Sequence, residues 1–105
     1  MLSFRADPFV GESVKEKYQK LEARIRDGKR VKKGITLIVY AINEKDLFDL
    51  LPANEMKFPL RKKQDIYVLG IAGSRKEAME LVQGMVMEVY GRTGGFDVRG
   101  YFGGL

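Results

Sequence analysis

The chain has 105 residues, of which 45% are hydrophobic, and its formal net charge is +5. This length suits one folded domain with its own core. The chain has no histidine and no cysteine, which excludes disulfides, zinc–thiolate sites, imidazole bases and Ser-His or Cys-His nucleophiles. We therefore expect no catalytic residue, no metal site and no cofactor, and a binding protein is favoured over an enzyme.

The first ten residues lack the apolar stretch of a signal peptide. No apolar run approaches the roughly 20 residues that span a bilayer. These features predict a cytoplasmic protein without membrane contact.

The charge is concentrated at the start of the chain. Residues 1–33 carry ten lysines and arginines against five acids, whereas residues 34–105 carry nine of each sign. Such a concentration of positive charge is typical of a surface that contacts an anionic partner.

Residues 1–6 are predicted to be a loose tail or a short edge segment. A helix should follow, beginning either at Asp7 with Pro8 or at the capping pair Ser13 and Glu16. It should end at Asp27 and Gly28. The predicted buried stripe consists of Val10, Val14, Tyr18, Leu21 and Ile25. A hairpin around Asp27 and Gly28 is the alternative.

The basic run KRVKK at residues 29–33 follows this helix. It is interpreted either as a solvated connector or as a contact to nucleic acid or another anion. The residues assigned to such a contact are Lys15, Lys29, Arg30, Lys32 and Lys33.

A near-continuous apolar run predicts a buried strand at residues 35–42. Asn43, with Asp46 three residues later, then predicts a capped helix over residues 44–51, which Pro52 ends. Alternating apolar residues around Pro59 predict an edge strand over residues 56–61.

The most legible stretch is a strand at residues 66–72, a turn at Gly73 and a helix that Ser74 and Glu77 cap. The helix should run to Tyr90, with Gly91 following as a C-terminal residue. Its N-terminus, with Ser74 and Arg75, is alternatively an anion site, but capping accounts for the same residues. A last strand is predicted over residues 96–102.

These elements predict an α+β protein with a ferredoxin-like βαββαβ sandwich at residues 34–105, preceded by a basic helix and linker at residues 1–33. Its sheet should be four-stranded and antiparallel, with two helices on one face. The strands at residues 35–42 and 66–72 should be central. Because both are apolar on each face, either the N-terminal helix or a second subunit must cover the second face.

Three functional hypotheses follow. The first is a self-associating, non-enzymatic binding or regulatory module, most simply a homodimer. Its predicted interface residues are Ile38, Tyr40, Met79, Val86, Met87 and Tyr90. The second is nucleic-acid or polyanion binding through the basic N-terminal region. The third is a small-ligand pocket between the turn at Gly73 and Ser74 and the turn at Gly94 and Gly95.

Overall fold

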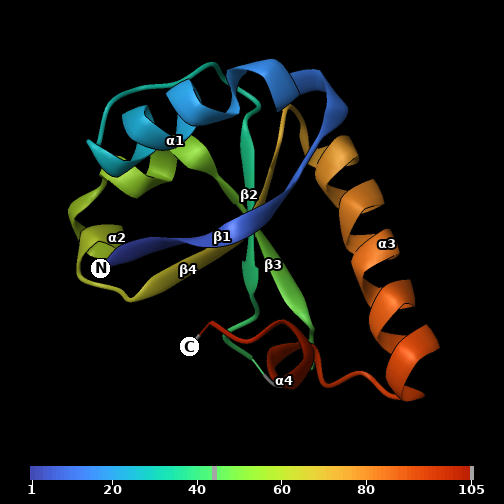
Figure 1. The fold of residues 1–105 in the computed structure, drawn as a ribbon. Helices are drawn as coiled ribbons and strands as arrows, with labels where there is room; N and C mark the ends of the chain where they lie inside the picture. Colours follow the sequence, from blue (N-terminus) through green and yellow to red (C-terminus); the bar gives the residue numbers. More distant parts are fainter. Residues whose placement is uncertain (44, 105) are drawn as a thin grey trace.

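The computed structural model describes residues 1–43 and 45–104 (Figure 1). It is an α+β domain built on a mixed sheet of four strands. The strands are β1 (Leu2–Val10), β2 (Thr36–Tyr40), β3 (Phe48–Pro52) and β4 (Ile66–Ala72). The α-helices are α1 (Tyr18–Arg26), α2 (Pro59–Lys62), α3 (Arg75–Thr93) and α4 (Val98–Phe102). Two 3-10 helices, η1 (Glu12–Lys17) and η2 (Ala53–Lys57), precede α1 and α2.

The strand order is β1-β4-β2-β3. β4 pairs with β1 in parallel and with β2 in antiparallel, and β2 pairs with β3 in antiparallel. The predicted central position of the two most apolar strands, β2 and β4, is confirmed. The ferredoxin-like topology is wrong, because the N-terminal segment supplies an edge strand and two of the predicted strands are helical.

β4 has a register irregularity at Leu69, which has no Cα partner in either neighbouring strand. β2 pairs Ile38 with Gly70 and then Val39 with Val68, so the register passes over Leu69. β1 passes over it as well, between its pairs with Val68 and Gly70. Such bulges bend a strand and increase its local twist.

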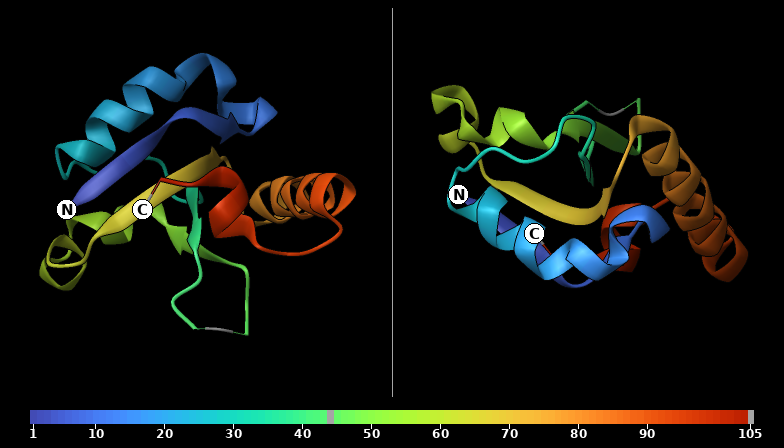
Figure 2. Two further views of the ribbon diagram at one scale, coloured as in Figure 1. Left: turned by 60° about the horizontal axis from the view of Figure 1, so that its bottom comes forward. Right: turned by 90° about the horizontal axis from the view of Figure 1, so that it is seen from above.

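Each face of the sheet carries its own core. On one face, Val14 of η1 and Leu21 and Ile25 of α1 pack with Leu37 and Val68. On the other, α3 and α4 pack against residues that include Ile38, Tyr40 and Leu69. The two helical layers lie on opposite sides of the sheet (Figure 2). The N-terminal helix of the same chain therefore covers the second face.

The N-terminal helical segment begins at Glu12, close to the later of the two predicted starts. Asp7 and Pro8 lie in β1 instead, within the stretch where pairing to β4 is interrupted. A proline is tolerated there because it removes no ladder hydrogen bond. The predicted end is confirmed, since Gly28 adopts a φ of 70° directly after α1, and the hairpin alternative is wrong.

The strand, turn and helix around Ser74 are confirmed. The Ser74 side chain accepts a hydrogen bond of 3.1 Å from the backbone N–H of Glu77 and caps α3. The helix passes the predicted end at Gly91 and stops at Thr93. Gly94 then supplies the left-handed conformation, with a φ of 73°.

The helix predicted over residues 44–51 is wrong within the described residues, because β3 and a turn occupy this stretch; residue 44 lies outside them. Asn43 Oδ1 accepts from the backbone N–H groups of Lys45 and Asp46. This is the hydrogen bonding that caps a helix, and here it closes a hairpin turn.

Two predicted edge strands are also wrong. Pro59 occupies the first turn of α2, a position that proline favours. In the last segment, Asp97 caps α4, and Val98 and Phe102 are both buried. Their spacing of four fits one face of a helix, although the wider pattern had indicated alternation.

Candidate functional site

A groove of about 620 Å³ lies between α1 and the connector that leads to β2. Six of the residues that line it are basic, and its two apolar lining residues are Leu21 and Val31. The basic residues are Lys17, Lys20, Arg24, Arg30, Lys32 and Lys33. We call this feature the basic groove.

The helical segment supplies one side of the basic groove. Lys17, Lys20 and Arg24 are spaced by three and four residues, which brings them to the same side of a helix. Leu21 lies between them and is only 9% exposed, because it packs into the core beneath. Burial of the apolar stripe thus fixes the direction in which these three cations point.

The connector supplies the other side and is held by α1 itself. Gly28 turns the chain, and the backbone N–H of Lys29 donates to the Arg24 carbonyl oxygen over 2.9 Å. The Arg24 side chain then donates from Nε and Nη2 to the carbonyl oxygen of Arg30, over 3.0 and 2.6 Å.

A second clamp comes from Asn54 of η2. Its Oδ1 accepts from the Val31 backbone N–H over 2.8 Å, and its Nδ2 donates to the Val31 carbonyl oxygen over 3.0 Å. Val31 is buried in the core and lines the basic groove together with Leu21. Arg30, Lys32 and Lys33 therefore extend from a connector that is already ordered, which lowers the entropic cost of binding.

The electrostatic character of the basic groove is uniform. None of the described residues that line it is acidic. In the described part of the chain, none of its six cations lies within 4.0 Å of a carboxylate oxygen. Elsewhere on the same helical segment, Lys15 pairs with Glu12 and Arg26 pairs with Glu22. Closely spaced cations without counter-ions attract a multiply charged anion.

The structure separates the predicted anion-contact residues. Arg30, Lys32 and Lys33 line the basic groove, whereas Lys15 and Lys29 do not. Ser74 and Arg75 belong to the start of α3. The sequence pattern was not used to assign Lys17, Lys20 and Arg24 to this contact. Their spacing of three and four residues, which places them on one side of a helix, was the signal that could have identified them.

The N-terminus of α3 is occupied by the protein's own carboxylate. Glu77 accepts hydrogen bonds from the Gly73 backbone N–H at 2.7 Å, from the Ser13 hydroxyl at 2.7 Å and from the Ser13 backbone N–H at 3.2 Å. The Gly73 N–H and then the Ser13 hydroxyl hold the pKa of Glu77 below its usual value. This arrangement favours capping over an external anion at Ser74 and Arg75.

The two glycine turns that were predicted to border a small-ligand pocket do not lie together. Gly73 and Gly94 lie at opposite ends of α3, which is about 28 Å long at 1.5 Å per residue.

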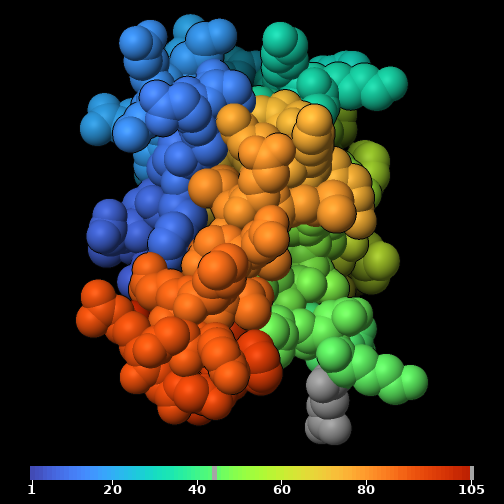
Figure 3. Space-filling model, turned by 90° about the vertical axis from the view of Figure 1, so that its right-hand side faces the viewer, coloured from blue at the N-terminus to red at the C-terminus, as the bar shows by residue number. Residues whose placement is uncertain are grey.

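The predicted interface residues fall into two sets. Ile38 and Tyr40 are buried beneath α3 and α4 of the same chain. Met79, Met87 and Tyr90 are 57%, 66% and 55% exposed on α3, and Val86 is partly exposed. Figure 3 views the molecule onto this helix. Phe96, from the segment after α3, stacks on Tyr90 with ring centroids 5.2 Å apart.

Comparison with protein-family models, curated proteins and solved structures found no significant match. Among the described residues, no helix has the length and hydropathy needed to cross a membrane. Across residues 1–43 and 45–104, no group of three or more acidic, histidine or cysteine side chains is placed to hold a metal ion.

Proposed function

We propose that the protein binds nucleic acid through the basic groove and that it does so by contacts to phosphates. The observation that supports this most directly is the gathering of six cations, from two segments of the chain, around one groove that has no acidic lining among the described residues. Phosphate contacts supply most of the affinity in sequence-independent binding.

The residues that line the basic groove also indicate which part of a nucleic acid it contacts. Base stacking needs exposed aromatic rings, and no aromatic residue lines the basic groove in the described structure. Tyr18, the nearest aromatic residue along α1, is half-buried and donates its hydroxyl hydrogen bond to Glu22 over 2.8 Å. We therefore expect little dependence on base sequence.

Fluorescence anisotropy with labelled mixed-sequence oligonucleotides, at two or more salt concentrations, tests the proposal. If all six cations contact phosphates, the slope of log K against log salt is about −4 for a single strand, from roughly −0.7 per contact. The variant Lys17→Ala/Lys20→Ala should bind at least roughly tenfold more weakly, with a slope reduced in magnitude by about 1.4.

The matched control is Lys45→Ala/Lys76→Ala, which removes the same charge from two exposed lysines outside the basic groove. This control should retain most of the affinity. Equal losses in both variants would indicate attraction to net charge alone. Absence of binding at low salt, or tighter binding to anionic vesicles than to nucleic acid, would contradict the proposal.

Self-association through the outer face of α3 is a second proposal. Met79, Met87, Tyr90 and Phe96 are each more than half exposed there, and exposed apolar surface of this kind favours a protein contact. Light scattering during size-exclusion chromatography should show a dimer that Met87→Lys/Tyr90→Lys converts to a monomer. A wild-type monomer at high concentration would contradict it.

A further inference from the structure

A second basic run lies near the end of α1 although it is distant in the sequence. Residues 61–63 read RKK. A β-carbon built on Gly28 would lie 3.7 Å from Lys62 Nζ, so this ammonium group sits beside the turn that ends α1. The same turn leads into the connector that carries Arg30, Lys32 and Lys33.

The three basic residues of this second run differ in their partners. Arg61 donates to Glu55 and to Gln64, each over 3.1 Å. Lys62 and Lys63 are exposed, and within residues 1–43 and 45–104 neither forms an ion pair. A cation beside a helix C-terminus is favoured by the helix dipole. The dipole accounts for the position of Lys62 but not for a second unpaired cation next to it.

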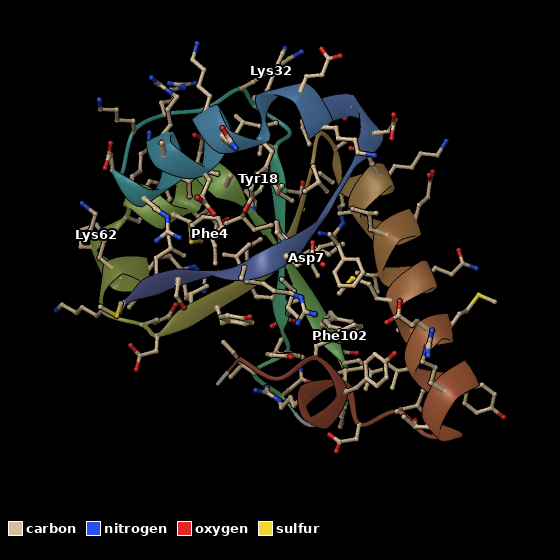
Figure 4. All side chains as sticks on the ribbon, viewed as in Figure 1. Phe4, Asp7, Tyr18, Lys32, Lys62 and Phe102 are labelled. Carbon is tan, nitrogen blue, oxygen red and sulfur yellow. The ribbon has the colours of Figure 1, made fainter. Side chains whose placement is uncertain are left out.

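The cations do not share one flat surface. In Figure 4, Lys32 lies at the top of the molecule and Lys62 at its left side. The connector leaves the end of α1 and returns above the helix toward β2 (Figure 1), with the exposed Lys29 near its start. The basic side chains therefore follow a path that bends around the end of α1. Asp27 is the exposed acid at that bend.

The curvature selects between forms of nucleic acid. α1 has nine residues and is about 14 Å long. A duplex has a persistence length of about 150 base pairs and does not bend over such a distance without a large deformation cost. A single strand bends freely.

We infer that the ligand is single-stranded nucleic acid, and that its backbone continues from the basic groove around the end of α1 to Lys62 and Lys63. This inference rests on the proposed function, and it adds the form of the nucleic acid and the direction of its path.

The test compares oligonucleotide length and form. Wild type, Lys62→Ala/Lys63→Ala and the basic-groove variant Lys17→Ala/Lys20→Ala are titrated with mixed-sequence single strands of 4 and 12 nucleotides and with a 12-base-pair duplex. Lys62→Ala/Lys63→Ala should weaken binding of the 12-nucleotide strand by at least about threefold and reduce the salt slope in magnitude by about 1.4. Its affinity for the 4-nucleotide strand should match that of wild type. Wild type should bind the duplex more weakly than the 12-nucleotide strand.

The outcomes separate the inference from the proposed function. Loss of binding in Lys17→Ala/Lys20→Ala, with no effect of Lys62→Ala/Lys63→Ala on the 12-nucleotide strand, would overturn the extended path and leave the proposed function intact. Tighter binding of the duplex would overturn the choice of a single strand. If neither strand nor duplex binds, both proposals fail. Unchanged far-ultraviolet circular dichroism of each variant confirms that altered binding is not caused by unfolding.

Discussion

The helices α1 and α3 cover opposite faces of one sheet, yet their outer surfaces differ. α1 buries Leu21 and Ile25 and presents Lys20 and Arg24, which form no ion pair within the described residues. α3 buries Ala78, Met85 and Val89 and presents Met79, Met87 and Tyr90 to solvent. Packing on the sheet determines only the inner stripe of each helix. The outer residues are free to suit a partner, and our two proposals assign a polyanion to α1 and an apolar partner to α3.

The inner and outer faces of α3 can be compared with two methionines. Met85 is 1% exposed and Met79 is 57% exposed. Met85→Ala should lower the free energy of unfolding by about 3 kcal/mol, because it leaves a cavity in the core. Met79→Ala should change it by less than about 0.5 kcal/mol.

Denaturant unfolding of both variants, followed by circular dichroism, measures this difference. Equal losses would mean that Met79 is also buried in solution, and dilution of the protein would then show whether a second subunit buries it.

Glu77 joins the two helical layers, because its carboxylate on α3 accepts hydrogen bonds from Ser13 of η1 and from Gly73. We expect Glu77→Gln to lower the free energy of unfolding by about 1 kcal/mol at pH 7, since hydrogen bonds to a charged group are the stronger ones and solvent screens this one in part.

The effect should depend on pH with a definite sign. The folded pKa of Glu77 lies below its usual value of 4.5. The carboxylate therefore contributes its full stabilisation above about pH 4.5 and loses it as the pH falls through the lowered folded pKa. Thermal unfolding of wild type and Glu77→Gln between pH 7 and pH 3 should show the two midpoints converging. A constant difference over this range would contradict the role of the charge.

The sequence predicted best where the signals are local. The Ser74 cap, the following helix and the apolar strand before it lie within about 30 consecutive residues, and all three are confirmed. The helix predicted after Asn43 was wrong because a side chain that accepts hydrogen bonds from two backbone N–H groups can close a hairpin turn as well as cap a helix. For residues 1–6 the edge-segment alternative is confirmed, but the full extent of β1, Leu2–Val10, was not predicted because its pairing depends on β4, far along the chain.

Half of the basic residues in the candidate site could be predicted from the sequence. Arg30, Lys32 and Lys33 stand out as a run. Lys17, Lys20 and Arg24 are interspersed with acids along the sequence, and only the helical spacing separates them from Glu16 and Glu22. The clamp from Asn54 to Val31 has no local sequence signal, because it joins segments 23 residues apart.

The pairing of β1 with β4 constrains how the chain acquires its structure during synthesis. Met1 and Asp65, which meet at one end of this pair, are 64 residues apart. β1 therefore has no strand to join until β4 leaves the ribosome, roughly 3 to 13 seconds later at 5–20 residues per second. Contacts between distant residues also slow folding in general. The edge strand β1 can thus complete the sheet only after the β2–β3 hairpin and β4 have been synthesised.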